Sequence, residues 1–534
     1  MNRTRSDAIG PEDIGRRTHR VRSARRWRGS RRFAATLLPA VLLVAACSSD
    51  ADKDASTTAA PATTAATATT AATATTAGSD TTAGSEDTAT TEGTETSEAG
   101  GTETTAGTET TEVTETTDTV PAGPAPADEI GITDSEIHVA MLADVVTAVN
   151  PGLFKKSIDV INAWAEIVNE NGGLAGRTVV VDSVDTKLDP NESRNQAINA
   201  CSNDFAMVGS EALLLLDMSD VEACVDAQGK ATGLPNLAGL AFGPDQACSP
   251  LTYAVSSLQG TYCATRTEPE QTITVQTGDA RYFQTLGLDL HGIWIYNSDI
   301  ATAKATQLPT FEEASILGTK KDGDGFYASS GSAPQSALTP IVQVLKRNDS
   351  TFAQNGSTPP NMVLFRKEAE LQGVDSVKVW NCSANCYVDY FIETGGSSVE
   401  GTYQMLPTVP FFDEYEEVPA LKVLVDKLGG VDKIDSNALA TYVNALLFQD
   451  AVEKIVASGT VLTRQALLDQ IAATHDFDAG GILGPTDVGN RSGSPCMMMV
   501  QVVDGTWKRV FPEEPYAFDC TPENLVQIKL NTNG

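Results

Sequence analysis

The sequence has few basic residues: 37 lysines and arginines stand against 70 aspartates and glutamates, which gives 534 residues a net charge of −33. The first 46 residues hold 11 of those arginines and only three acids, so the rest of the chain is more acidic still. Such an excess of negative charge repels nucleic acids and anionic lipid surfaces. We therefore expect no nucleic-acid partner, while the length allows a large folded core.

The motifs of common enzyme classes are also missing. The sequence contains no GxSxG elbow, no HExxH and no phosphate-binding loop. The run Asp322-Gly323-Asp324-Gly325 resembles the start of a calcium loop, but the later ligands are absent and we predict a turn. Beyond the first 46 residues, the histidines His138, His291 and His475 are far apart and unpaired in the sequence. We expect no catalytic residue, no metal and no cofactor.

The N-terminus has the features of an export signal. A run of arginines precedes the apolar segment 33–46, which is shorter than the roughly 20 residues that span a bilayer. The segment ends in Val44-Ala45-Ala46-Cys47, which resembles the bacterial lipobox. That resemblance implies a lipoprotein signal peptide over residues 1–46 and a lipid on Cys47 that anchors the protein to the outer face of the bacterial cell membrane. No full twin-arginine pattern is present, so both the Sec and the Tat export routes stay open.

A long segment of low complexity follows Cys47. Residues 48–127 include 27 threonines and contain no leucine, isoleucine or aromatic residue. A segment with so little apolar surface cannot offset the entropy cost of folding. We predict a disordered tether over residues 47–127, whose threonines can be glycosylated or bare.

Eight cysteines remain when Cys47 is set aside, and their even number fits an oxidising compartment. Eight cysteines allow 105 pairings. Pairing between sequence neighbours predicts the set Cys201–Cys224, Cys248–Cys263, Cys382–Cys386 and Cys496–Cys520.

From residue 131 onward, strand and helix patterns alternate. In the first half, Asp189 stands before Pro190 and Glu192, which is a typical helix start. The other apolar patterns of this half predict strands at 137–142, 178–181, 205–208 and 237–242, and helices at 158–168 and 220–228. Strand–helix–strand order with short connections predicts a parallel sheet covered on both faces.

The second half repeats this order. Apolar patterns predict strands at 291–296, 351–354 and 377–380, and helices at 338–346, 361–372 and 439–455. Thr463 is the expected N-cap of a last helix, which carries Leu467, Leu468 and Ile471. The sequence therefore predicts an α/β protein with two Rossmann-like units in one chain.

Four stretches resemble the type I periplasmic binding proteins, in the leucine/isoleucine/valine-binding branch. They begin GITDSEIHVAMLAD, AWAEIVNENGGLAGR, SVKVWNCSANC and NALLFQDAVEK, and they occur in the family's order over residues 131–520. The resemblance implies two lobes joined by three hinge crossovers, near 268–274, 403–408 and 476–483. It also implies a solute-binding domain over 128–534, with lobe 1 at about 131–270 and 408–478 and lobe 2 at about 275–404 and 482–525.

In open α/β sheets, ligands bind beyond the carboxyl ends of the strands. The loops expected there are 144–150, 209–216 and 238–242 in the first lobe, and 296–299, 355–358 and 381–387 in the second. From these loops we predict the ligand-binding residues Ser210, Leu213, Leu215, Leu240, Tyr296, Asn297, Ser357, Asn381, Ser383 and Asn385. An apolar run such as 213–216 also suits a buried core.

The family's amino-acid-binding members hold the ligand's ammonium with an acidic residue of the second lobe. No acidic residue lies at the matching place here, so we expect a small, partly apolar acid or amide rather than a zwitterion. The resemblance implies a monomer that captures this solute and delivers it to an ABC permease. A ligand sensor with the same lobes and a secreted enzyme are the alternative functions.

Overall fold

A computed structural model describes residues 124–147, 152–241, 243–257, 259–268, 270–300, 303–383 and 385–531. The predicted signal peptide, Cys47 and the predicted tether up to residue 123 lie outside the described residues. The last residues of the predicted tether are part of the fold, because Leu462 donates its backbone N–H to the carbonyl of Pro126 at 2.9 Å and Arg177 donates to the carbonyl of Ala125 at 2.9 Å. The folded part therefore includes residues 124–127, ahead of the expected start at 128.

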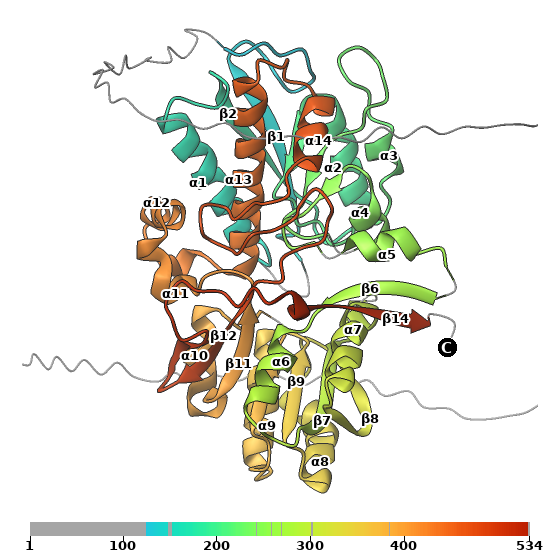
Figure 1. The fold of residues 1–534 in the computed structure, drawn as a ribbon, viewed down its shortest axis with the longest axis vertical. Coiled ribbons are helices and arrows are strands. Elements are labelled where there is room, and N and C mark those ends of the chain that lie inside the picture. Colours follow the sequence, from blue (N-terminus) through green and yellow to red (C-terminus); the bar gives the residue numbers. More distant parts are fainter. Residues whose placement is uncertain are drawn as a thin grey trace, which may run out of the picture. The chain divides into compact units, whose positions relative to one another are not determined.

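The first sheet has five parallel strands in the order β2-β1-β3-β4-β5. These strands are β1 Glu136–Ala143, β2 Thr178–Asp185, β3 Ala206–Val208, β4 Asn236–Leu237 and β5 Thr252–Tyr253. Its helices are α1 Lys155–Glu170, α2 Pro190–Asn203, α3 Ser219–Glu222, α4 Pro244–Cys248, α5 Gln259–Thr265, α12 Pro419–Leu428, α13 Ser436–Ala457 and α14 Arg464–Ala472. Helix α13 comes from far along the chain and lies beside α1 (Figure 1).

Local signals explain where these elements begin and which face they bury. The Asp189 side chain accepts hydrogen bonds from the backbone N–H groups of Asn191 and Glu192, so α2 begins at Pro190 as predicted. On α1, Val160, Trp164 and Val168 follow one another at four-residue spacing and are buried. That spacing places them on one face of the helix, which is the face packed into the core.

The second sheet has seven strands in the order β13-β12-β11-β10-β9-β7-β8. Strands β7 to β11 are parallel, while β12 and β13 add an antiparallel edge. The strands are β7 His291–Asn297, β8 Lys320–Ser329, β9 Phe352–Gly356, β10 Val379–Cys382, β11 Thr402–Leu406, β12 Met498–Val503 and β13 Thr506–Phe511. The accompanying helices are α6 Gly278–Thr285, α7 Ala303–Ile316, α8 Thr339–Asn348, α9 Pro359–Leu371, α10 Asp389–Gly395 and α11 Phe411–Glu414.

The chain passes three times between the two sheets. At the first passage, β6 (Glu270–Gln276) pairs with the C-terminal strand β14 (Leu525–Asn531) in a separate antiparallel ribbon. The second and third passages meet each other: Thr408 and Leu483 form an antiparallel bridge, and Val409 donates its N–H to the carbonyl of Ile482 at 2.9 Å. The predicted α/β class and its two lobes with three crossovers are confirmed.

Three local predictions are wrong in extent or type. The helix expected over 220–228 is only the single turn α3, because the carboxylate of Asp226 accepts the N–H groups of Gln228 and Lys230 and forms a tight turn instead. The strand expected over 237–242 ends at Leu237, because the chain turns away at Gly239, where a side chain would lie 2.9 Å from the carbonyl of Gly209. The expected turn at 322–325 is a bulge within β8.

Among the described residues, no helix is both long enough and apolar enough to cross a bilayer.

Candidate functional site

The loops that follow β1, β3 and β4 meet at the carboxyl edge of the first sheet. Gly209 donates its backbone N–H to the carbonyl of Leu237 at 2.7 Å, and Leu240 donates to the carbonyl of Ser210 at 3.2 Å. Glu211 donates its N–H to the carbonyl of Leu142 at 2.7 Å. These contacts bring the predicted site residues Ser210 and Leu240 together at one edge.

The four predicted residues of the first lobe differ in burial. Ser210 is fully buried, and its hydroxyl accepts the N–H of Leu142 at 3.3 Å. Leu215 lies in the hydrophobic core, which agrees with the alternative that the apolar run 213–216 is buried core rather than pocket wall. Leu213 and Leu240 are half-buried and pack against the rim of that core. Of the four predicted residues, only these two leucines offer exposed apolar surface, and Leu216 of the same loop is 45% exposed.

The carboxylate of Asp144 holds the leucine loop in place. This side chain is fully buried, and it accepts the hydroxyl of Thr186 at 2.6 Å, the N–H of Leu188 at 2.6 Å and the N–H of Leu213 at 2.9 Å. Three donors from two loops therefore converge on one carboxylate at the end of β1. This arrangement fixes the position of Leu213 relative to the sheet.

A buried acid, Glu211, lies at the same edge and is not among the residues predicted from the sequence. Its side chain is fully buried, and neither carboxyl oxygen has a hydrogen-bond partner among the described residues. Burial raises the pKa of Glu211, the hydroxyls of Ser157 and Thr441 lower it in part, and the nearby Asp435 adds a smaller rise, so that the resulting pKa is about 8. At neutral pH this carboxyl group keeps its proton and is uncharged.

Glu211 had a signal in the sequence, because it directly follows Gly209-Ser210 at the end of a predicted strand. The helices that bury the side chain, α1 and α13, are separated in sequence by more than 200 residues, so its burial depends on long-range packing.

In the second lobe, a chain of amide and carboxyl groups includes two of the predicted residues. The side-chain nitrogen of Asn381, on β10, donates to Asp279 at 2.7 Å and to Gln354 at 3.1 Å. Gln354 in turn donates to the hydroxyl of the exposed residue Ser383 at 3.3 Å. Burial raises the pKa of Asp279, and the hydrogen bond from Asn381 opposes that rise. The carbonyl oxygen of the Asn381 side chain is buried and has no partner among the described residues.

A second polar cluster contains Asn297 and Ser357. The hydroxyl of Ser357 donates to the carbonyl of Ser329 at 3.2 Å, and the side chain of Asn361 donates to the hydroxyl of Ser329 at 2.8 Å. Asn297 accepts the N–H of Asp299 at 2.9 Å. The first two contacts join the loops after β8 and β9, whereas the contact of Asn297 stays within the loop after β7 and shapes that loop.

The two remaining predicted residues lie apart from both clusters. Tyr296 packs its ring against Phe326, with centroids 4.8 Å apart. Asn385 is exposed and has a positive φ of 56° in the loop after β10. The disulfide Cys382–Cys386 closes that loop. The other disulfides also join the predicted neighbours, Cys201–Cys224, Cys248–Cys263 and Cys496–Cys520.

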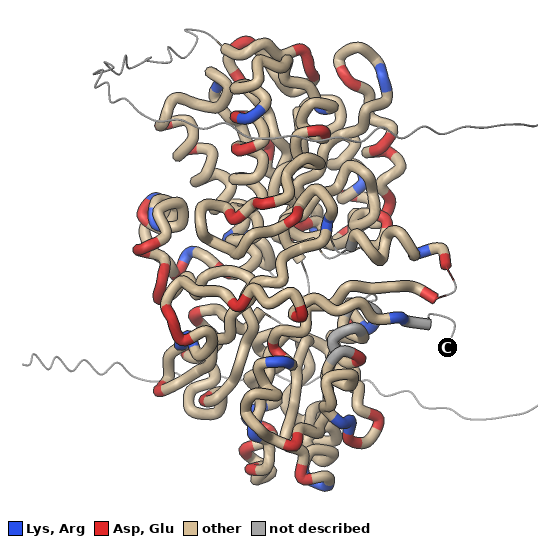
Figure 2. The backbone as a smooth tube through the Cα atoms, in the orientation of Figure 1, with Lys and Arg blue, Asp and Glu red and all other residues tan. Residues whose placement is uncertain are grey.

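The three histidines, which are unpaired with one another in the sequence, each have an acidic neighbour in the structure. Each of the three contacts an aspartate through its Nδ1 atom: His138 contacts Asp182 at 3.0 Å, His291 contacts Asp322 at 2.8 Å and His475 contacts Asp487 at 2.7 Å. Only the first pair gains a third metal-ligating side chain within the described residues, that of Asp204. Acidic residues otherwise outnumber basic ones and are spread over both lobes (Figure 2).

Comparisons with known proteins agree with this architecture. Residues 312–506 match the family model described as periplasmic binding protein. No curated protein sequence matches the chain. Among solved structures, a fatty acid ABC transporter substrate-binding protein from Thermomonospora curvata has a TM-score of 0.55 at 17% identity, covering 72% of this chain and 94% of its own.

Two further similar structures mention leucine in their descriptions. A leucine binding protein from Thermotoga maritima has a TM-score of 0.53 at 14% identity and covers 72% of this chain and 99% of its own. An ABC transporter substrate-binding protein from Desulfitobacterium hafniense, solved in complex with Leu, has a TM-score of 0.52 at 15% identity and covers 70% of this chain and 100% of its own. At these identities the likeness is one of fold.

Proposed function

Because this chain has the fold of the type I periplasmic binding proteins, as its sequence predicted, we propose that it is an extracytoplasmic solute-binding lipoprotein. It captures a small, partly apolar molecule between two lobes and delivers it to an ABC permease. One observation carries this proposal. Each of the two large sheets has a buried polar group without a partner among the described residues at the carboxyl edge of its parallel strands: Glu211 in the first sheet and the side-chain carbonyl of Asn381 in the second. Ligands of open α/β folds bind at these edges.

The chemistry of the edge favours an acid or amide with an apolar chain. The half-buried Leu213 and Leu240 offer apolar contacts. Glu211, whose pKa is raised to about 8, keeps its proton at neutral pH and can donate a hydrogen bond to a carboxylate or an amide oxygen. In that form it carries no charge to pair with an ammonium group. The descriptions of two similar structures name a fatty acid and Leu. Both of these small molecules combine a carboxylate with an apolar chain.

Calorimetry of the purified chain with leucine, 4-methylpentanoate and 4-methylpentanamide tests this assignment. The acid or the amide should bind more tightly than leucine, and ligand at about a thousand times its Kd should stabilise the fold by roughly 4 kcal/mol. If leucine alone binds tightly, the proposed absence of an ammonium partner is wrong. If none of the three molecules binds, the ligand chemistry is different.

The pH dependence of binding isolates the role of Glu211. Between pH 7 and pH 9 a carboxyl group with a pKa of about 8 loses most of its proton, so the Kd for 4-methylpentanoate should rise about 10-fold. In Glu211→Gln the amide stays neutral and the Kd should stay constant over this range. Glu453→Gln, the same substitution at an exposed position on α13, should follow the wild type. If the Kd of the wild type and that of Glu211→Gln depend on pH in the same way, Glu211 does not contact the ligand.

The proposed delivery to a permease is based on sequence features that lie N-terminal to the folded domain, namely the lipobox and the tether. We propose that a lipid on Cys47 and the tether that leads from it to the folded residues from 124 onward hold the solute-binding domain at the outer face of the cell membrane, within reach of the permease. The lobe limits given above, at about 131–270 with 408–478 and about 275–404 with 482–525, are part of the same proposal. Cells that lack the protein should take up less of the labelled solute, and an equal uptake rate would contradict delivery.

A further inference from the structure

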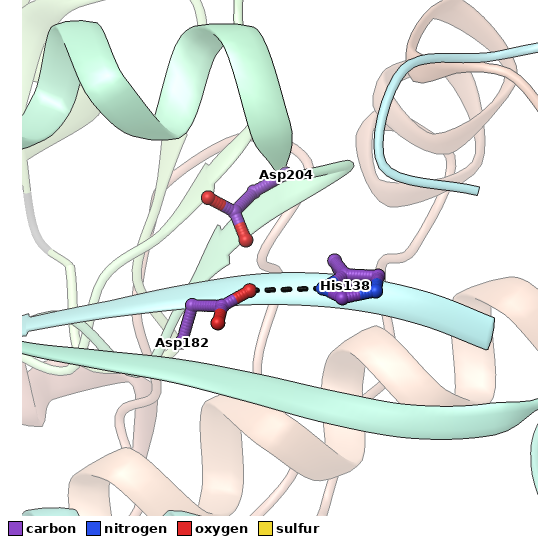
Figure 3. Close-up of side chains that lie close together, drawn as sticks. All are labelled: His138, Asp182 and Asp204. Carbon is purple, nitrogen blue, oxygen red and sulfur yellow. Dashed lines mark hydrogen bonds and ion pairs between the residues drawn. The ribbon is translucent and has the colours of Figure 1, made fainter. Parts of the chain in front are cut away.

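Three metal-ligating side chains come together on the first sheet at residues far apart in the sequence. His138 is the third residue of β1, Asp182 lies on β2, and Asp204 lies between α2 and β3. One potential ligand atom of each lies within 4.8 Å of those of the other two. Figure 3 shows the carboxyl group of Asp204 directed toward His138 and Asp182.

The parallel register of the strands creates this cluster. Asp182 on β2 lies opposite Ala140 on β1, and His138 lies two residues before Ala140, on the same face of the sheet. Asp204 is brought in from the other side of β1, because the next residue, Phe205, donates its N–H to the carbonyl of His138 at 2.9 Å. Each ligand is therefore held by sheet hydrogen bonds rather than by a loose loop.

Asp204 provides a second, independent observation. The residue is only 2% exposed, and its Oδ1 atom has no hydrogen-bond donor among the described residues. Its carboxyl group lies against that of Asp182, so the two acids must share either a proton or a cation. A buried carboxyl oxygen without a partner is costly and calls for an explanation, such as a bound ion. The neighbouring guanidinium of Arg464 does not fill this role, because it donates to the backbone carbonyls of Val225, Cys201 and Asp204.

The cluster is open to solutes and has further polar groups around it. Together with Asn162, Asn199 and Ser202, the three side chains line one surface pocket. Glu136 lies 3.4 Å from the second ring nitrogen of His138, in the position of the outer carboxylate that often orients a metal-binding histidine. An ion can therefore enter the pocket and meet a histidine whose ring is already oriented.

We propose that His138, Asp182 and Asp204 bind one divalent transition-metal ion, with Zn²⁺ the best match to this set. One imidazole nitrogen and two carboxylates suit zinc better than calcium or magnesium, which prefer oxygen ligands alone. The three protein ligands leave a fourth position for water. The bound ion would tie β1, β2 and the end of α2 together, away from the edge proposed for the solute.

Calorimetric titration with Zn²⁺ tests this site. The protein is the full chain, purified without a histidine tag and with its disulfides intact. We expect one ion per chain, and binding weakened at least 30-fold in His138→Gln and in Asp204→Asn. His475→Gln is the matched control, because its histidine also contacts an aspartate but gains no third ligand within the described part of the chain. This control should bind Zn²⁺ like the wild type.

The visible absorption of bound Co²⁺ reports directly on metal coordination, which a change in protein stability alone would not alter. Co²⁺ bound in the cluster should give the strong visible d–d absorption of a four-coordinate ion in the wild type and in His475→Gln, whereas His138→Gln should show only the weak absorption of hydrated Co²⁺. Circular dichroism checks that each variant is folded. The proposal is overturned if wild type and Asp204→Asn bind Zn²⁺ equally, or if His475→Gln removes the binding. Because the solute site is separate, both cluster variants should keep the solute affinity, so failure here is distinguishable from failure of the proposed function.

Discussion

The side chain of Asn381 donates a 2.7 Å hydrogen bond to the carboxyl group of Asp279, which lies 102 positions earlier in the chain. Both side chains are buried, and the same amide nitrogen also donates to Gln354 on the neighbouring strand. A buried carboxyl group whose pKa burial has raised thus depends on a donor from β10. This contact links α6 to the carboxyl edge of the second sheet.

Removal of that donor should destabilise the protein. In Asn381→Ala the buried oxygen of Asp279 loses its partner, and we expect the free energy of unfolding to fall by about 1–3 kcal/mol. Asn348→Ala, at an exposed position at the end of α8, should change it by less than about 0.5 kcal/mol. Urea denaturation of the two variants makes the comparison. Equal midpoints for both would show that the buried hydrogen bond contributes little.

Removal of the three hydrogen bonds to Asp144 should lower the free energy of unfolding by a larger amount. Asp144→Ala leaves the hydroxyl of Thr186 and two backbone N–H groups without their acceptor, so the free energy of unfolding should fall by about 3 kcal/mol. Asp159→Ala removes an exposed carboxylate that pairs with Lys155, and it should cost less than about 1 kcal/mol. Thermal and urea unfolding measure both variants. A loss as small in Asp144→Ala as in Asp159→Ala would contradict the structure.

Parts of the fold that depend on local signals were predictable from the sequence. Asp189 and Pro190 start α2, and Thr463 starts α14 by accepting the N–H of Ala466 at 3.1 Å, because capping acts within a few residues. The helix expected over 220–228 failed for an equally local reason, since the turn at Asp226 offered its backbone an alternative set of hydrogen bonds.

Parts of the candidate site depend on contacts between distant segments, and the sequence did not reveal them. Glu211 lies near Ser157 of α1 and Thr441 of α13, two helices that are distant in sequence and pack together. Asp204 reaches His138 through the register of the first sheet. Leu215 had the same apolar signal as Leu213, yet one lies in the core and the other at its rim. Periodicity cannot distinguish a pocket wall from a core position when the loop between strands has no regular period.

The even number of cysteines outside Cys47 predicts no free thiol in the folded domain. Thiol counting under denaturing, non-reducing conditions should find none, and two or more per chain would contradict the four bonds. Replacing Cys201 and Cys224 together by alanine opens a loop of 23 residues and should cost about 2–4 kcal/mol. The same change at Cys382 and Cys386, only four residues apart, should cost less, because a short loop loses little entropy on closure.

The lipobox predicts that the mature protein begins at a diacylated Cys47. Intact mass should show a chain without residues 1–46 and with added lipid, and the protein should partition into detergent. In Cys47→Ser the lipid cannot be attached, and the protein should leave the membrane fraction. A Cys47→Ser protein that stays anchored would show that another segment holds it.

Glu211 should also make stability depend on pH, in a direction fixed by its raised pKa. The folded state holds its proton up to about pH 8, whereas an unfolded glutamate releases it near its ordinary value of 4.5. The stabilising contribution is therefore complete below about pH 4.5 and is lost as the pH rises toward 8, by up to about 1.4 kcal/mol per pH unit. Other buried acids such as Asp279 add slopes of the same sign, so the informative quantity is the difference between variants.

Urea denaturation at pH 5, 6.5 and 8 measures that difference. The free energy of unfolding of the wild type should fall relative to that of Glu211→Gln across this range, because the glutamine cannot ionise. Glu453→Gln, exposed on α13, should keep the slope of the wild type. Parallel curves for wild type and Glu211→Gln would mean that Glu211 is ionised throughout. A charged Glu211 could pair with an ammonium group, and an amino acid would then replace the acid or amide as the expected solute.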